Sequence, residues 1–308
     1  MWYELLPKIL NMSLTGGVVI LAVLLARLLL RRAPKVFSYA LWAVVLFRLL
    51  CPVSITSNIS LLNIFDTPVT ETGSIEYIPS DIVHVENPTV ALPVPGVNET
   101  INEILPQGEE QLVADPLEFP TSLMTYIWFA GIAVLLIYSV VQFIRLRRKL
   151  VGAVPLCENI YLADHIASPF VLGLFRPKIF LPSSLSEVEQ EYIIQHEKHH
   201  IRRGDHVTRI LAFAALCVHW FNPLVWLAFV LSGRDMEMSC DEAVMKRMDG
   251  DIRADYSASL LHLATGRRII SGTPLAFGEG DTGGRIKNVL NYKKPAFWGI
   301  ILAVVACV

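Results

Sequence analysis

The sequence predicts a mainly α-helical integral membrane protein, in which transmembrane helices accompany a small cytoplasmic α+β domain. Three observations lead to this fold class. Of the 308 residues, 53% are hydrophobic and 18% are charged, and the mean hydropathy is +0.49, which is too apolar for an ordinary soluble domain. Apolar runs of membrane-spanning length occupy the first half, and short strand-like runs follow within residues 150–203. The net charge of −2 gives no sign of direct nucleic-acid binding.

Three apolar runs account for the predicted transmembrane helices. Residues 5–30 form the first and residues 36–52 the second, so residues 1–52 are expected to be two helices joined by a short turn. Residues 123–144 form the third. Each run suits a bilayer core of about 30 Å. A cleaved signal peptide is the competing interpretation of the first run, but a strongly basic flank and no small-residue cleavage site follow it.

The charges are unevenly distributed along this part of the chain. Residues 53–122 contain eleven acidic residues, no Lys or Arg, and many prolines, which predicts an extended, acidic extracellular loop. Because cytoplasmic flanks carry the excess of Lys and Arg, the N-terminus is expected outside a bacterial plasma membrane, and residues after the third run begin in the cytoplasm. The basic residues are Arg27, Arg31, Arg32 and Lys35 in the first turn, and Arg145, Arg147, Arg148 and Lys149 after the third run.

The chain changes character after the third run. Residues 159–162 and 178–181 are predicted to form short strands, the second bounded by prolines. Residues 168–173 lie between them and form either an edge strand that binds a substrate backbone or a purely structural hairpin. A capping box at residues 186–189 then predicts the start of a helix, and Gly204 predicts its end.

This helix carries an HExxH motif. His196 and His200 are four residues apart, so one helix face presents both imidazoles to one metal ion. Glu197 lies one step around the helix, where a carboxylate can take a proton from a water molecule. Neutral imidazole is a common zinc ligand. The competing interpretation is a polar helix face on which histidines happen to cluster.

A catalytic zinc site needs a third protein ligand, and the sequence offers two candidates. His206 has the spacing of the HExxHxxGxxH pattern, but Arg203 stands where that pattern has glycine. Glu237 is favoured instead, with Asp241 one helical turn later. Asp241 is expected to accept the free N–H of a ligating histidine and so to orient its ring. Cys240, between them, is interpreted as a packing residue.

Glu237 can reach the HExxH helix only if the intervening chain returns to the same side of the membrane. Residues 206–231 are apolar enough to enter the bilayer, and a single crossing would separate the ligands by about 30 Å. Asn222-Pro223 interrupts this segment midway, and both residues favour a turn. The sequence therefore predicts a membrane-dipping hairpin.

Taken together, these motifs resemble those of the BlaR/MecR-type antirepressor membrane metallopeptidases, which are gluzincins. The resemblance implies that His196, His200 and Glu237 bind one Zn²⁺ ion, that Glu197 is the catalytic base, and that Asp241 supports a ligand. It also implies a zinc metalloendopeptidase that cleaves itself or a cytoplasmic transcriptional repressor in response to an external signal. The motifs are Pro169-Phe170-Val171, residues 177–182, residues 196–200, Arg203-Gly204-Asp205, Asn222-Pro223 and residues 237–241.

The basic residues after the third apolar run and the last apolar run set the expected domain boundaries. Residues 145–294 are expected to be the cytoplasmic zinc metallopeptidase domain, and residues 295–308 the start of a truncated fourth transmembrane helix. The sequence contains no S-x-x-K motif, so nothing in it supports β-lactam sensing. Residues 267–294 are glycine-rich and are interpreted as a flexible linker, with self-cleavage near Ala276–Phe277 as a further hypothesis.

One alternative function stays open, and so does the oligomeric state. The alternative is a non-catalytic membrane receptor or scaffold whose zinc is structural or absent. A site of four protein ligands, with His206 or Cys240 as the extra one, favours that alternative. The expected partners are a protein substrate, the chain itself and the lipid bilayer, with a homodimer left open.

Overall fold

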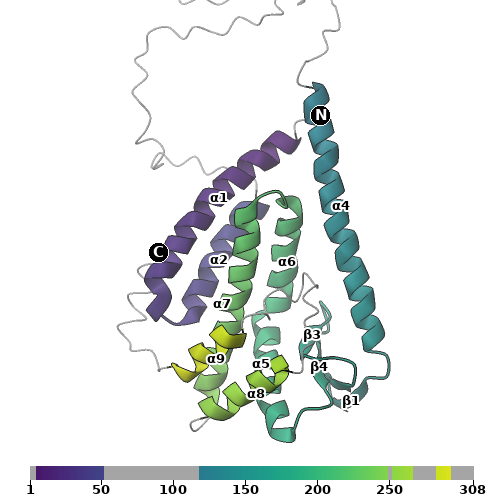
Figure 1. Cartoon of the computed structure of the whole chain (residues 1–308), viewed down its shortest axis with the longest axis vertical. Coiled ribbons are helices and arrows are strands. Elements are labelled where there is room, and N and C mark those ends of the chain that lie inside the picture. The colour runs from purple at the N-terminus through teal and green to yellow at the C-terminus, as the bar shows by residue number, and fades with distance from the viewer. Residues whose placement is uncertain (1–4, 52–117, 249–251, 266–281, 293–308) are drawn as a thin grey trace, which may run out of the picture. The chain divides into compact units, whose positions relative to one another are not determined.

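The structure, a computed structural model, describes residues 5–51, 118–248, 252–265 and 282–292 (Figure 1). The chain divides into two compact units, residues 1–52 with 125–308 and residues 53–124, and every contact described below lies within the first. Residues 53–117 of the expected extracellular loop at 53–122, the self-cleavage site and the fourth apolar run lie outside the described residues, and residues 118–122 of that loop belong instead to helix α4.

Helices dominate the described part of the chain, and a small sheet separates α4 from α5. The elements in order are α1 (Leu5–Leu29), a 3₁₀ turn (Leu30–Arg32), α2 (Lys35–Leu50), α4 (Glu118–Lys149), β1 (Val154–Cys157), β2 (Ile160–Ala163), β3 (Phe170–Leu172), β4 (Lys178–Pro182), α5 (Glu187–Arg203), α6 (Asp205–Val218), α7 (Pro223–Arg247), α8 (Arg253–Thr265) and α9 (Thr282–Leu290).

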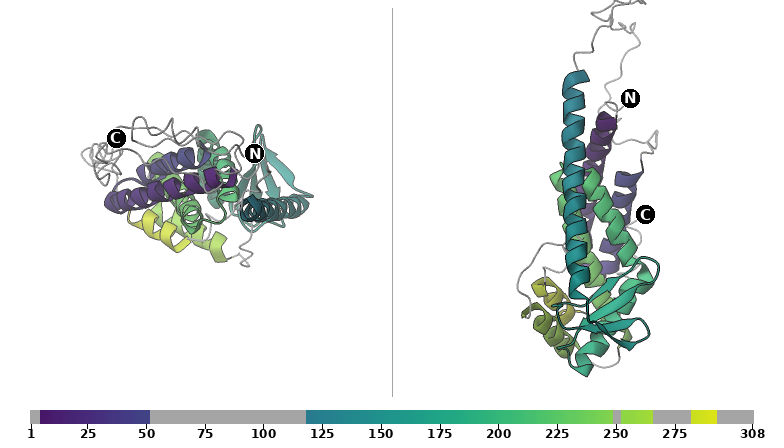
Figure 2. Two further views of the ribbon diagram at one scale, coloured as in Figure 1. Left: turned by 90° about the horizontal axis from the view of Figure 1, so that it is seen from above. Right: turned by 90° about the vertical axis from the view of Figure 1, so that its right-hand side faces the viewer.

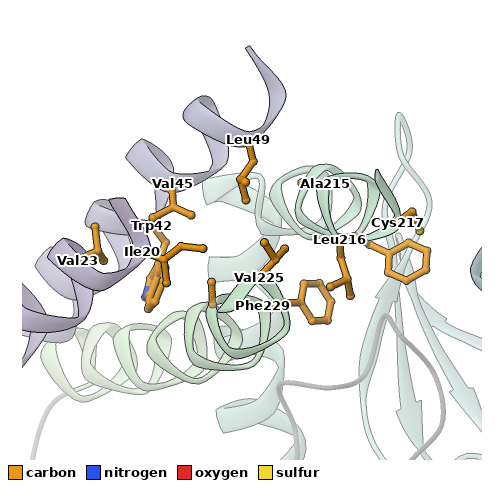
Figure 3. Close-up of a cluster of buried hydrophobic side chains, with 12 residues drawn as sticks. Ile20, Val23, Trp42, Val45, Leu49, Ala215, Leu216, Cys217, Val225 and Phe229 are labelled. Atoms are coloured by element: carbon orange, nitrogen blue, oxygen red, sulfur yellow. The ribbon is translucent and has the colours of Figure 1, made fainter. Parts of the chain in front are cut away.

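Helices α1, α2, α6 and α7 pack around one apolar core (Figure 3). Gly16 lets α1 approach α2 closely, since a Cβ atom there would lie 2.6 Å from Cδ2 of Leu49. Polar contacts tie the α1–α2 hairpin to α7. Arg27 forms an ion pair with Asp235 at 2.6 Å, and the Trp42 indole N–H donates to the same carboxylate at 2.9 Å. The first two helices are therefore held against the helix that carries Glu237.

Two helices in the described part of the chain are long and apolar enough to cross a membrane, namely α1 and residues 122–149 of α4. Helix α2 has 16 residues and is shorter than either. Helix α4 extends beyond the predicted 123–144 at both ends. At its C-terminal end it continues through the basic residues that follow the apolar run. Arg, Leu and Lys favour helix, so the helix does not stop where the apolar run stops.

Tryptophans connect α4 to the turn between α6 and α7. The Trp128 indole N–H donates to the Val218 carbonyl at 2.7 Å, and that of Trp220 donates to the Trp128 carbonyl at 3.2 Å. The Trp220 ring fills the space beside Gly131, where any side chain would collide with it. Trp226 in turn donates to the Trp220 carbonyl. These rings pack and also satisfy main-chain carbonyls at the turn.

The sheet follows directly after α4 (Figure 2) and has the strand order β1-β2-β4-β3. Strands β2 and β4 lie where the sequence predicted strands, and they pair in parallel. Strand β3 is antiparallel to β4 and forms an edge of the sheet. Both β3 and β4 contact α5. The sheet thus presents an edge strand beside the helix that carries the HExxH motif.

Local sequence signals set both ends of α5. Ser186 and Glu189 form the predicted capping box, and Gly204 ends the helix in the left-handed conformation with φ of 76°. Helix α6 begins immediately afterwards. Its end and the start of α7 are separated by residues 219–222, and the Asn222 side chain caps α7 by accepting the Leu224 N–H at 2.9 Å. The chain therefore reverses between α6 and α7, which lie side by side (Figure 1).

The segment interpreted as a flexible linker contains a helix. Helix α9 includes Gly283 and Gly284, although glycine disfavours helix by about 1 kcal/mol per residue. Tertiary packing outweighs this cost, because Val289 is buried in a cluster with Val244 of α7 and Tyr256 of α8. The interpretation of residues 267–294 as a linker was therefore wrong for residues 282–290.

Candidate active site

Helices α5 and α7 bring together the two HExxH histidines and Glu237, all of which are buried. The Nε2 atoms of His196 and His200 are 3.0 Å apart. A Glu237 carboxylate oxygen lies 3.3 Å from Nε2 of His196, and the other lies 3.7 Å from Nε2 of His200. The reversal between α6 and α7 thus returns Glu237 to α5 across 41 residues of sequence.

These three side chains fit a zinc ion. Zinc binds imidazole nitrogen and carboxylate oxygen at about 2.0–2.2 Å, and a tetrahedral arrangement then separates neighbouring ligand atoms by about 3.3–3.5 Å. The separations of 3.0, 3.3 and 3.7 Å bracket that value. Two imidazoles and one carboxylate are a donor set typical of catalytic zinc.

Cys240 lies near the same point. Its thiol and the two imidazoles have ligand atoms within 4.8 Å of one another. The thiol donates to the main-chain carbonyl of His196 at 3.3 Å. Burial raises the pKa of Cys240, but positive charge on His196 and His200 outweighs burial and lowers it. Cys240 is therefore a candidate metal ligand near the site, whereas Glu237 already has ligand-like distances to both histidines.

The orientation of His200 depends on residues close to it in sequence. Its Nδ1 lies 2.6 Å from Oδ2 of Asp205, the first residue of α6. Arg203 donates to both oxygens of the same carboxylate, at 2.7 and 3.0 Å from Nε. Arg203 also bonds Ser239 of α7 at 2.7 Å. Asp205 thereby fixes the ring so that Nε2 points toward Glu237.

The orientation of His196 depends on residues from three other helices. Nδ1 of His196 lies 2.9 Å from the Tyr256 hydroxyl and 3.3 Å from Oδ1 of Asp241. The Tyr256 hydroxyl donates to Asp241 at 2.7 Å. Arg285 of α9 donates to both oxygens of Asp241, at 2.9 and 2.7 Å, and lies 3.3 Å from Glu237. Asp241 therefore lies beside His196, as the sequence predicted, within a larger network.

Charge holds the carboxylates in their anionic form. Burial alone would raise the pKa of Asp241, but the Arg285 guanidinium lowers it to about 2. Burial would likewise raise the pKa of Glu237, and positive charge on His200 and Arg285 instead lowers it well below its usual range. Anionic Glu237 is the form that binds a cation.

Glu197 is buried and lines the same cavity as the two histidines and Glu237. The cavity has a volume of about 1740 Å³ and extends to β3 and to the C-terminal end of α4. Its size is sufficient for several residues of an extended peptide. A carboxylate, a candidate metal site and an edge strand therefore share one space.

His206 does not join this cluster. Its Nε2 lies 3.3 Å from the Leu174 carbonyl, in the chain that follows β3. Sequence reasoning also missed Arg285 and Tyr256 and gave no role to Asp205. Asp205 follows His200 by five residues at the start of a helix, and that position was a usable signal. No pattern marks Arg285 or Tyr256, since each reaches the site only through packing of α8 and α9.

Comparison with known proteins agrees with these features. The family described as BlaR1 peptidase M56 matches residues 7–289. The chain is 35% identical over 99 residues to the regulatory protein BlaR1 of Bacillus licheniformis, covering 31% of this chain and 16% of that protein. It is 30% identical over 107 residues to the methicillin resistance mecR1 protein of Staphylococcus aureus, covering 33% and 18%. The aligned regions thus span less than a fifth of these relatives. The match along most of the sequence shows that this chain belongs to the BlaR1 peptidase M56 family.

Proposed function

We propose that the protein is a membrane-embedded zinc metalloendopeptidase with a cytoplasmic active site. The observation that carries this proposal is the convergence of His196, His200 and Glu237, whose ligand atoms lie 3.0–3.7 Å apart. These three residues would hold one Zn²⁺ ion. Asp205 and Asp241 would orient the two histidines.

The residues of the chain have separate roles in peptide hydrolysis. A zinc ion would supply Lewis acidity that polarises the scissile carbonyl and acidifies a water molecule. Glu197 accepts a proton from that water and later delivers it to the leaving amine. The free edge of β3 binds the substrate backbone by main-chain hydrogen bonds, as an added strand. This arrangement selects an extended peptide over a folded segment.

The distribution of basic residues supports a cytoplasmic site. The backbone N–H of Lys35, in the basic α1–α2 turn, donates to Glu242, which lies one residue after Asp241. Arg147 and Lys149, at the basic end of α4, line the same cavity as His196. Both basic segments thus lie beside the proposed metal site. Since such segments face the cytoplasm, the site faces it as well, and the α6–α7 hairpin dips into the bilayer from that side.

A role in signalling follows from the regulatory relatives. Proteins named as regulatory or resistance proteins share the family, so we propose that this chain cleaves itself or a transcriptional repressor after an external signal. The predicted domain boundaries agree with this role, with an extracellular segment at 53–122 and a cytoplasmic protease domain from residue 145.

The test compares zinc content and proteolysis in the detergent-purified full chain. About one zinc per chain is expected in the wild type and in His199→Ala, a matched control because His199 adjoins His200 but is absent from the ligand cluster. His200→Ala and Glu237→Gln should lose the metal. Glu197→Gln should retain zinc and lose cleavage, by about a hundredfold or more. Zinc retained by Glu237→Gln would contradict the proposed ligand set.

The second candidate is a receptor with a structural metal, and the position of Cys240 favours it. A four-ligand site that includes the thiol would leave no open coordination position. Cys240→Ser distinguishes the two functions. Unchanged zinc content and retained cleavage support the protease, whereas loss of zinc supports the structural site.

A further inference from the structure

The cavity that contains the proposed metal site is strongly polarised. Among the described residues that line it, the carboxylates are Glu197, Asp205 and Glu237, and all three lie at the metal site. Much of the rest of the wall is apolar, and the charged residues in it are all cations. They are Arg145, Arg147, Arg148 and Lys149 of α4, Arg176 between β3 and β4, Lys178 of β4, Arg209 of α6 and Arg285 of α9. A low-dielectric cleft lined by one sign of charge concentrates ligands of the opposite sign.

One face of α6 adds side-chain nitrogens that have no protein partner. Arg209 and His206 are three residues apart, so they lie on the same helix face, and both line the cavity. Nη2 of Arg209 and Nδ1 of His206 are buried without a hydrogen-bond partner among the described residues. Leaving such a buried group unsatisfied is unfavourable. Both side chains therefore contribute to the cavity wall with part of their hydrogen-bonding capacity unused.

The same face lies next to the strand that would bind a substrate. Nε2 of His206 is 3.3 Å from the Leu174 carbonyl, two residues after the end of β3. Arg176 follows in the same connection, and Lys178 begins β4. A peptide added along β3 would therefore run past Arg209 and the basic connection as it leaves the metal site.

We propose that the α6 face of His206 and Arg209, together with Arg176 and Lys178, is a subsite that selects peptides with acidic side chains beside the scissile bond. Arg209 binds the substrate carboxylate, and its guanidinium is suited to paired hydrogen bonds with it. His206 contributes to the wall of this subsite and donates from Nε2 to the Leu174 carbonyl. This inference rests on the proposed peptidase function and names its substrate class.

The chain itself supplies a probe. Glu279 and Asp281 follow the expected self-cleavage position Ala276–Phe277 by two and four residues. A peptide of residues 271–284 therefore carries two carboxylates on one side of that bond. Its neutral counterpart, with Glu279→Gln and Asp281→Asn, has the same length and nearly the same shape.

The experiment measures binding separately from cleavage. Both fluorescent peptides are titrated into the full chain carrying Glu197→Gln in detergent, and their dissociation constants are compared. The acidic peptide is expected to bind about tenfold more tightly, since hydrogen bonds between charged groups are the strong ones. Arg209→Gln should remove most of this preference. Arg202→Gln is the matched control, because Arg202 is an exposed arginine that does not line the cavity.

Several outcomes overturn the inference. Equal binding of the two peptides, or no binding of either, excludes an acidic subsite. An unchanged preference in Arg209→Gln shows that Arg209 does not form it. If Arg209→Gln does not fold, Arg209→Lys is used, and it should keep part of the preference. If Arg209→Gln changes the binding of anionic lipid vesicles and leaves the peptide preference unchanged, the basic residues of the wall bind lipid and not a substrate. If the wild-type chain binds the acidic peptide preferentially but does not cleave it, the proposed peptidase function is contradicted and the subsite still stands.

Discussion

The two histidines of the HExxH motif are four residues apart on one helix, yet their surroundings differ. His200 bonds Asp205, which follows it by five residues, and Arg203 holds that carboxylate from the neighbouring turn. His196 bonds Tyr256 and lies beside Asp241, 60 and 45 residues away. One side of the site is assembled by a tight turn in the chain, and the other by packing of α7, α8 and α9.

This difference indicates where the site is vulnerable. The contacts around His200 form at the junction of α5 and α6, where Gly204 in the left-handed conformation makes the turn. The His196 side requires three helices to pack together, and it carries a partly buried Arg285 whose charge is paired with Asp241 and Glu237. We therefore expect substitutions on the His196 side to affect the fold more than equivalent substitutions on the His200 side.

The largest effect is expected from Asp241→Asn. The change leaves the partly buried Arg285 guanidinium with Glu237 as its remaining carboxylate partner, and breaking a buried ion pair costs up to about 3–5 kcal/mol. Denaturant unfolding in detergent measures the loss. The double variant Asp241→Asn with Arg285→Gln should recover part of it, since no unpaired charge remains. A loss equal to that of Asp205→Asn would contradict the comparison between the two sides.

Asp205→Asn should change metal binding more than stability. Its amide cannot serve as acceptor for both His200 and Arg203 with the same geometry, so His200 loses its fixed orientation. Removing such a supporting carboxylate typically lowers metal affinity by about 10–100-fold. The free energy of unfolding should fall by only about 1–3 kcal/mol, because Arg203 keeps its bonds to Ser239 and Met236. Competition with a chelator measures the affinity, and an unchanged affinity would refute the supporting role of Asp205.

Tyr256→Phe separates the contribution of the Tyr256 hydroxyl from that of the Asp241–Arg285 ion pair. The ring and its packing against Tyr192 stay, and only the hydroxyl that joins His196 to Asp241 is removed. The expected loss of stability is about 0.5–1.5 kcal/mol. Thermal unfolding detects this change, with Tyr192→Phe as the control. A loss as large as that of Asp241→Asn would mean that the hydroxyl, and not the ion pair, organises this side.

The smallest effects are expected at the start of α5, the helix that carries both histidines. Ser186→Ala removes the cap and should cost about 1 kcal/mol. Burial alone would raise the pKa of Glu189, but hydrogen bonds from Ser186 and His262 lower it. A carboxylate whose pKa is lower in the folded protein stabilises the fold above its unfolded pKa, and that contribution is lost as pH falls through the folded value. Glu189→Gln should therefore weaken the acid-induced loss of stability, and an unchanged acid profile would exclude this contribution.

Sequence reasoning reached the parts of the site that follow from local patterns. The four-residue spacing of His196 and His200, the cap at Ser186 and the stop at Gly204 each depend on a few neighbouring residues. The approach of Glu237 to the histidines was also predictable, because Asn222-Pro223 marks a reversal that returns the chain toward the HExxH helix. Helix α9 was not, because its glycines oppose the helix and only contacts with α7 and α8 stabilise it.

By itself the sequence determined the two apolar helices of membrane-spanning length, the HExxH helix and its ends, and the turn that sends α7 back toward α5. These features arise from hydrophobic length, helical periodicity and turn chemistry, which act over short distances in the chain. Only the tertiary structure decided which side chains surround each histidine, that Cys240 lies near both, and that His206 faces the cavity beside Arg209. Those contacts depend on how helices pack, and packing is a property of surfaces that are far apart in sequence.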